Sequence, residues 1–154
     1  MTVKAIPDNY PRVSPYLCID GAAAAIDFYK KAFGATERMR MGAPGGKIGH
    51  AEIDIDGALV MLADEHPEMG FRSPTSIGGS PVVIHMYVKD VDAFCKRAVD
   101  AGAALVRPVA DQFYGDRNGT LRDPYGHVWS VATHIEDLTP EEMRKRGEAL
   151  GKGG

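Results

Sequence analysis

Histidine and carboxylate side chains alternate with apolar residues in the segment GHAEIDI (49–55). This alternation predicts a strand in which His50 and Glu52 share one face, about 6.6–6.8 Å apart along the strand. A second alternating segment, VVIHMYV (82–88), carries His85. Two imidazoles and one carboxylate form a recognised facial set for one divalent metal, such as Fe, Ni, Mn or Zn, with open positions for a chelating substrate. We therefore predict His50, Glu52 and His85 as metal ligands, with Glu52 also moving a proton. The alternative is that these side chains only pair with neighbours or solvent and that no metal is bound.

Aromatic and charged side chains elsewhere suit the binding of a small molecule. The segment QFYGDR (112–117) joins two aromatic rings to a carboxylate and a guanidinium, a mixture that grips planar or anionic molecules. Its structural alternative is an ion pair between Asp116 and Arg117 that supports the turn. The side chains that we predict to contact a ligand are Tyr16, Tyr87, Phe113, Tyr114, Arg117 and Ser130.

The periodicity of apolar residues predicts two copies of one β-α-β-β-β module. The first copy has a strand at 13–19, a helix at 22–33 and strands at 36–41, 49–55 and 58–64. The second copy has a strand at 82–88, a helix that begins near Asp90 and strands around 104–109, 117–122 and 127–133. The helical segments FYKKAFGA and FCKRAVDAGA both end in Gly-Ala before a strand, which indicates an internal repeat of about 65 to 70 residues.

Capping and turn residues mark the ends of several elements. We expect Asp20 to cap the N-terminus of the first helix and Gly34 to cap its C-terminus. The dipeptide Asp56-Gly57 predicts a type I′ hairpin turn. A Thr-Pro-Glu-Glu capping box that starts at Thr139 predicts a last helix over about 139–150, which we interpret as a packing or dimerisation element.

Composition limits the classes of function. The 154 residues are 44% hydrophobic and 25% charged, which suits one globular domain with a proper core. The net charge of −3 and the pI near 5.9 leave no basic face for nucleic acid or an anionic membrane. No stretch approaches the ~18–20 apolar residues of a membrane span. Cys18 and Cys95 lie far apart without metal-binding spacing, so we interpret both as small buried hydrophobic residues in a reducing compartment. We therefore expect a cytoplasmic protein whose partner is a small molecule.

The expected organisation is a single domain over residues 1–154. It comprises a first module at about 12–65, a linker at 66–81, a second module at 82–134 and the last helix at 139–150. The linker carries Met69 and Phe71 among Gly and Pro residues. It either folds over a cavity as a lid or only connects the modules.

The order and spacing of several motifs resemble a known superfamily. The motifs are PYLCIDGAAAAIDFYKKAFGA, GHAEIDIDG, YVKDVDAF, YGDRNGTLRDPYGHVWSVATH and EDLTPEE. Together they resemble the vicinal oxygen chelate superfamily, which includes glyoxalase I, bleomycin-resistance and fosfomycin-resistance proteins and extradiol dioxygenases, and they look most similar to its PhnB-like branch. The resemblance implies an α+β fold in which two βαβββ modules form a curled mixed sheet around a cavity, with an added C-terminal helix. By the same analogy it implies a homodimer.

Catalytic members of that superfamily hold a divalent metal on four inward strand positions, usually His or Gln, Glu, His and Glu. The resemblance places these positions at Ser14, Glu52, Val83 and Ser130 of this sequence. Only Glu52 keeps a metal-binding group, and Ser130 stands where a glyoxalase has a carboxylate. Because a neutral hydroxyl is a poor ligand for a catalytic divalent ion, the standard glyoxalase I ligand set is mostly absent.

Two functions of different classes therefore stay open. The first is a metal-dependent lyase, isomerase or dioxygenase that acts on a small oxygenated substrate. The second is a metal-free protein that sequesters an antibiotic or toxin between aromatic and acidic side chains without catalysis. A regulatory or scaffold role without a ligand is a third, weaker interpretation. The sequence leaves open whether the protein is an enzyme.

Overall fold

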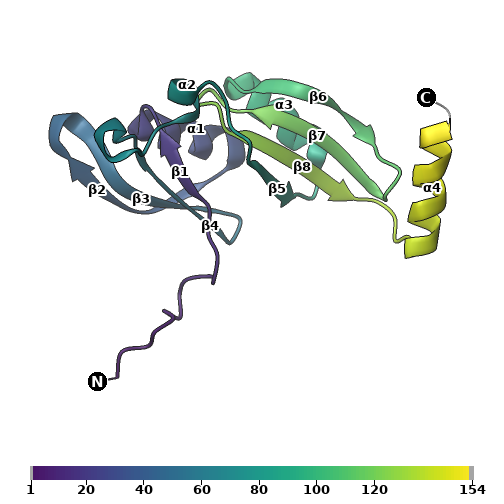
Figure 1. Ribbon diagram of the computed structural model, residues 1–154, viewed down its shortest axis with the longest axis horizontal. Coiled ribbons are helices and arrows are strands. Elements are labelled where there is room, and N and C mark those ends of the chain that lie inside the picture. The colour runs from purple at the N-terminus through teal and green to yellow at the C-terminus, as the bar shows by residue number, and fades with distance from the viewer. Residues whose placement is uncertain (1, 153–154) are drawn as a thin grey trace. The chain divides into compact units, whose positions relative to one another are not determined.

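The computed structural model describes residues 2–152, which form two compact units (Figure 1). The first unit comprises residues 2–81 together with 125–127, and the second comprises residues 82–124 together with 128–152. Each unit contains one four-stranded sheet. The division after Pro81 coincides with the predicted start of the second module.

The first unit has the predicted β-α-β-β-β order. Its elements are β1 (Tyr16–Ile19), α1 (Ala22–Phe33), β2 (Thr36–Ala43), β3 (Lys47–Ile55) and β4 (Ala58–Asp64). The strands lie in the order β1-β4-β3-β2, with β1 parallel to β4 and the other pairs antiparallel. Asp56 and Gly57 connect β3 to β4 with φ angles of 49° and 92°, so the predicted type I′ turn is confirmed.

The second unit repeats this topology. Its elements are β5 (Val83–Tyr87), α3 (Val91–Ala101), β6 (Ala104–Asp111), β7 (Asp116–Arg122) and β8 (Val128–His134). The strand order β5-β8-β7-β6 has β5 parallel to β8 and the other pairs antiparallel, as in the first unit. The predicted internal repeat and the α+β class are therefore confirmed.

Four shorter or terminal elements complete the described chain. They are η1 (Pro44–Gly46), η2 (Pro67–Met69), α2 (Pro74–Ile77) and α4 (Pro140–Lys152). The hydroxyl of Thr139 accepts a hydrogen bond from the backbone N–H of Glu142 at 3.1 Å, so the predicted cap of the last helix is confirmed. Within residues 2–152, no helix is long and apolar enough to cross a membrane.

One face of each sheet packs against the helix of its own unit. The predicted apolar stripe of α1 is buried throughout; it consists of Ala22, Ala25, Ile26, Tyr29 and Phe33. In the second unit, Trp129 and Val131 of β8 are buried together with Val91 and Cys95 of α3. Successive residues of a strand point to opposite faces. In β3 and β5, every second residue therefore lies on the face of the sheet that the helix leaves uncovered.

The predicted cap at the start of α1 is wrong. The N-cap residue is Gly21, and no side chain of its own segment caps the helix. Instead, Asp64 at the end of β4 accepts hydrogen bonds from the backbone N–H groups of Gly21 and Ala22, both at 3.0 Å. Its second oxygen accepts the N–H of Ile48 at 2.7 Å. The predicted C-cap is confirmed, because Gly34 has a φ of 69° and its N–H binds the Tyr29 carbonyl.

Both cysteines are buried, as predicted, and each lies within one unit. Cys18 lies on β1 and Cys95 on α3. Burial raises the pKa of each thiol to about 11. Neither thiol is therefore an activated nucleophile near neutral pH.

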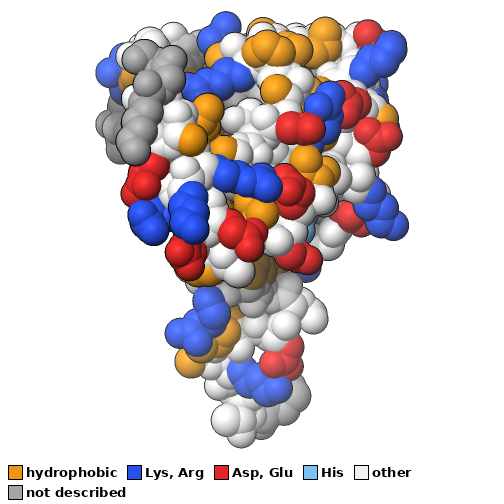
Figure 2. All heavy atoms as spheres, turned by 90° about the vertical axis from the view of Figure 1, so that its right-hand side faces the viewer, with side chains coloured by type: hydrophobic (Ala, Val, Ile, Leu, Met, Phe, Trp, Pro, Cys, Tyr) orange, Lys and Arg blue, Asp and Glu red, His pale blue; other side chains and the backbone are white. Residues whose placement is uncertain are grey.

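The surface charges are mixed in sign. On the face shown in Figure 2, Lys and Arg side chains alternate with Asp and Glu side chains, with apolar side chains between them. On this face the charged side chains do not form a patch of a single sign, which agrees with the scattered charges of the sequence.

Candidate functional site

A buried carboxylate lies on the face of the first sheet that α1 leaves uncovered. Only 5% of the surface of Glu52 on β3 is exposed, and both of its carboxylate oxygens have hydrogen-bonding partners. Nε2 of His50 lies 2.9 Å from Oε2, and the hydroxyl of Tyr10 donates to Oε1 at 2.9 Å. The hydrogen bond with His50, and that from Tyr10, lower the pKa of the Glu52 carboxyl against the opposing effect of burial. Glu52 is therefore ionised near neutral pH.

Tyr16 of β1 extends this set of hydrogen bonds toward solvent. Its hydroxyl lies 2.7 Å from Nδ1 of His50, and its side chain is 46% exposed. With the ring proton of His50 on Nε2 and donated to Glu52, Nδ1 is left to accept the hydrogen bond of the Tyr16 hydroxyl. Burial, followed by the charge of Glu52, raises the pKa of Tyr16, which keeps the phenol protonated. Hydrogen bonds thus run from Tyr16 to His50 and on to Glu52.

Tyr16 also forms one wall of a cavity of about 410 Å³ in the first unit. The cavity is lined by Tyr16, Gly49, Ala63, Asp64, His66, Met69 and Phe71. The linker supplies three of these residues, and a β-bridge between His66 and Phe71 holds it in shape. The rings of Tyr16 and Phe71 meet edge to face, with centroids 6.0 Å apart. The linker therefore forms a wall of the cavity and is more than a connector.

Methionine side chains surround Glu52 and His50 in the sheet. Met39 of β2 and Met61 of β4 lie directly opposite Glu52, and Met41 lies opposite His50. Residues that lie opposite each other in a sheet point to the same face, with Cβ atoms about 4.5–5.5 Å apart. We did not predict these methionines, although the alternation in TERMRM already carried the signal for Met39 and Met41. They give the carboxylate a soft, apolar and adaptable surrounding.

In the second unit, Ser130 joins two side chains of neighbouring strands. The side-chain amide of Asn118 on β7 donates to the Ser130 hydroxyl oxygen at 2.8 Å. The same oxygen lies 3.0 Å from Nδ1 of His85 on β5, which can accept the Ser130 proton. The ring of Tyr87 meets that of His85 edge to face at 4.9 Å, and its hydroxyl donates to Asp116 at 2.8 Å. Ser130, His85 and Tyr87 therefore belong to one polar face of the second sheet.

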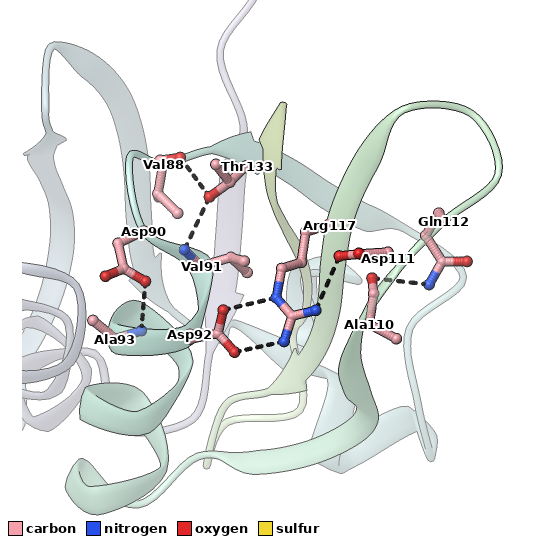
Figure 3. A network of polar contacts seen from close by, with 10 residues as sticks. All are labelled: Val88, Asp90, Val91, Asp92, Ala93, Ala110, Asp111, Gln112, Arg117 and Thr133. Carbon is pink, nitrogen blue, oxygen red and sulfur yellow. Dashed lines mark hydrogen bonds and ion pairs between the residues drawn. The ribbon is translucent and has the colours of Figure 1, made fainter. Parts of the chain in front are cut away.

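The ion pair between Asp116 and Arg117, which was the structural alternative to a ligand-binding role, is not formed. Figure 3 shows Arg117 between two other carboxylates. Its Nε and Nη2 donate to Asp92 of α3 at 2.8 and 2.9 Å, and its Nη1 donates to Asp111 of β6 at 2.9 Å. The cause is strand alternation, because successive residues of β7 point to opposite faces of the sheet. The guanidinium of Arg117 thus joins α3 to β6.

Of the other two predicted ligand residues of this region, Phe113 lies beside the last helix and Tyr114 contacts the Phe113 ring. The rings of Phe113 and Tyr114 meet edge to face at 5.2 Å. A methyl group added at Gly147 of α4 would lie 3.4 Å from the Phe113 ring, so the helix passes close to this ring. The carbonyl of Phe113 also accepts a hydrogen bond from Arg146 at 3.4 Å. This geometry gives Phe113 a packing role against α4.

Asp116 instead holds His134 at the end of β8. Nδ1 of His134 lies 2.8 Å from Asp116, and Nε2 lies 2.8 Å from Asp137. The hydrogen bonds to Asp116 and Asp137 raise the pKa of His134 above its ordinary value of 6.5. Both ring nitrogens donate when the imidazole is protonated, so the charged form fits this position.

This histidine is expected to make stability depend on pH. Because the folded pKa is raised, the stabilisation by His134 is fully present below pH 6.5, the unfolded value, and is lost as the pH rises through the folded pKa. We expect the difference in urea midpoint between wild type and His134→Gln to be largest near pH 5.5 and to shrink toward pH 9. The matched control is His66→Gln, at an exposed histidine paired with Glu68. A difference that stays constant from pH 5.5 to 9 would contradict the assignment.

The described residues do not fit the divalent metal that the resemblance implies. Both nitrogens of His50 and both oxygens of Glu52 already have partners, and Val83 and Ser130 offer no charged donor. His85 belongs to the second unit. Within residues 2–152, no three His, Cys, Asp or Glu side chains gather into a group that could hold a metal ion. Metal binding by His50, Glu52 and His85 stays a prediction from sequence.

Comparison with known sequences gives a family match over most of the chain. The sequence model described as the Glyoxalase/Bleomycin resistance protein/Dioxygenase superfamily matches residues 12–131. An uncharacterized protein of Mycobacterium tuberculosis is 47% identical over 146 residues, which cover 93% of this chain and 86% of that protein. An uncharacterized protein of Arabidopsis thaliana is 31% identical over 124 residues, which cover 76% of this chain and 74% of that protein.

Solved structures show the same fold. TioX from Micromonospora is 28% identical, with a TM-score of 0.62 over 84% of this chain and 100% of TioX. FosX of Listeria monocytogenes, a fosfomycin resistance protein solved with Mn(II) and a sulfate ion, has a TM-score of 0.62 over 89% of this chain and 97% of FosX. At 17% identity, the likeness to FosX shows the fold alone.

Proposed function

Because the chain belongs to the glyoxalase/bleomycin resistance protein/dioxygenase superfamily, we propose that it binds a small, largely apolar molecule in the cavity of its first unit, without a metal ion. The observation that carries this proposal is the position of Tyr16. Its ring forms a cavity wall, while its hydroxyl is hydrogen-bonded to His50 and through it to Glu52. A ligand in the cavity therefore contacts an aromatic ring that carries a hydroxyl group.

The size and lining of the cavity support a ligand with an aromatic ring. Its volume of about 410 Å³ lies within the range of roughly 300–1,000 Å³ that is usual for small-molecule sites. Tyr16 and Phe71 present their rings to it, and Met69 adds a flexible thioether that adapts to irregular shapes. Most of the lining surface is apolar although Asp64 and His66 contribute to it, and this favours a ligand with an apolar body.

The polar side chains of His50 and Glu52 already have hydrogen-bonding partners, and this favours binding without catalysis. A metal ion at His50 or Glu52 would have to displace Tyr16, Tyr10 or the bond between the two residues. The superfamily positions at Val83 and Ser130 would not compensate for that loss. The metal-dependent lyase, isomerase or dioxygenase is therefore the second hypothesis, favoured only by the retained Glu52.

Three finer assignments stay predictions. The order of the motifs favours the PhnB-like branch, and the family analogy favours a homodimer. The composition favours a cytoplasmic location. Light scattering on the purified protein tests the dimer, since a monomer at micromolar concentration would contradict it.

Equilibrium dialysis with the neutral aromatic probe 2-(2-naphthyl)ethanol tests the proposed function. We expect saturable binding to the wild type, weakened about tenfold in Phe71→Ala, because that variant removes one aromatic wall. The matched control is Val106→Ala, which removes an exposed apolar side chain from β6 of the second unit and should leave the affinity unchanged. Dialysis against a chelator should also change nothing. Absence of binding, or an affinity that depends on added Mn(II), would overturn the proposal.

A further inference from the structure

The N-terminal segment contacts the first sheet at Tyr10 and the neighbouring Asn9 carbonyl. It runs into β1 as an extended chain outside the sheet (Figure 1), and every residue from 2 to 13 is exposed except Tyr10. The Tyr10 hydroxyl donates to Oε1 of Glu52 at 2.9 Å. The Arg38 guanidinium lies over the Tyr10 ring, 5.4 Å from its centroid, and donates to the Asn9 carbonyl at 3.4 Å. One hydrogen bond, one cation–π contact and one long hydrogen bond therefore hold the segment over Glu52.

The surface beneath Tyr10 suits a cationic group. Glu52 is ionised and almost fully buried, and Met39 and Met61 lie opposite it on the two neighbouring strands. One carboxylate oxygen faces His50 and the other accepts the Tyr10 hydroxyl, while the positive charge of Arg38 also acts on the carboxylate. A cationic donor that replaces the Tyr10 hydroxyl would form a charge-assisted hydrogen bond with a largely buried carboxylate that lies between Met39 and Met61.

We propose that Tyr10 is a built-in cover of Glu52 that is displaced by the ammonium group of an aromatic amine. This inference rests on the proposed function, because the aromatic body of the amine occupies the cavity beside Tyr16. The ammonium donates to Oε1 of Glu52 in place of the phenol, and the segment from residue 2 to residue 13 leaves the sheet. The ligand class is thus a primary amine on an aromatic body, and the free protein is partly self-inhibited.

A pair of matched probes tests this proposal. The first is 2-(2-naphthyl)ethylamine, which is cationic at pH 7, and the second is the neutral 2-(2-naphthyl)ethanol. In Tyr10→Ala we expect the amine to bind about tenfold more tightly than in wild type, because it no longer competes with the contacts of Tyr10. The alcohol should bind both proteins equally. In Glu52→Gln the carboxylate is gone, so the amine should bind no more tightly than the alcohol. Tyr10 belongs to an exposed segment, so its replacement should leave the fold intact.

A second readout follows the segment itself. Saturating amine should accelerate cleavage by trypsin after Arg12, because the segment released from Tyr10's contacts can adapt its backbone to the protease, whereas the alcohol should not. Unchanged amine affinity in Tyr10→Ala, or an amine that leaves cleavage after Arg12 unaffected, overturns the cover while leaving cavity binding intact. Failure of both probes to bind the wild type overturns the proposed function together with this inference.

Discussion

Replacing Asp64 with alanine is expected to lower the free energy of unfolding by about 3 kcal/mol or more. The Asp64 carboxylate accepts three backbone hydrogen bonds, from Gly21, Ala22 and Ile48. Alanine would leave the N–H groups of the buried residues Ala22 and Ile48 without an acceptor, and each unsatisfied buried donor costs roughly 1–3 kcal/mol, whereas the N–H of the exposed Gly21 can bond to water. The variant would also loosen the start of α1 and one wall of the cavity.

Urea unfolding followed by circular dichroism measures this loss, and two further variants make it specific. Asp64→Asn keeps one carbonyl oxygen for Gly21 and Ala22 but turns an amide toward the N–H of Ile48, so its loss should be intermediate. Asp20→Ala removes the exposed side chain that the local pattern predicted as the cap, and its effect should stay within about 0.5 kcal/mol. A larger loss for Asp20→Ala than for Asp64→Ala would refute the assignment of the cap.

Replacing Trp129 with alanine is expected to cost the second unit about 3–5 kcal/mol. Trp129 is the only tryptophan of the chain and only 1% of its surface is exposed. Its indole N–H donates to Asp123 at 2.9 Å, and Asp123 is itself buried. Alanine therefore opens a cavity in the core and also removes a hydrogen bond to a buried carboxylate.

The unfolding of this variant in urea is also followed by circular dichroism, because the variant has no tryptophan whose fluorescence could be recorded. Trp129→Phe separates the two causes, because it refills most of the volume without restoring the hydrogen bond to Asp123, and it should lose less than the alanine variant. Val83→Ala is the matched control, at a β5 side chain that is 54% exposed. Equal losses for Trp129→Ala and Val83→Ala would contradict a core role for Trp129.

The elements of the fold could be predicted because their signals are local. The apolar stripe of α1, the Asp56-Gly57 turn and the cap at Thr139 depend on side chains within a few residues of one another. The strand order repeats because the same pattern of apolar residues occurs twice in the sequence. Such signals depend on backbone geometry and burial, so a single sequence is sufficient to find them.

The candidate site could be predicted only in part. Strand alternation placed His50 and Glu52 on one face, and their hydrogen bond confirms that they meet. The same alternation did not reveal that Tyr10 and Tyr16 occupy the remaining polar positions, or that Arg117 binds Asp92 and leaves Asp116 to His134. Each of these partners lies 18 or more residues away along the chain.

The sequence by itself determined the two βαβββ modules and the faces of their strands. The tertiary structure alone decided that Asp64 caps α1, that the linker walls a cavity and that Tyr10 covers Glu52. The physical reason is the range of the interactions. Periodicity and capping depend on neighbours in the chain, whereas a buried carboxylate binds whichever donors the folded backbone brings within about 3 Å of it.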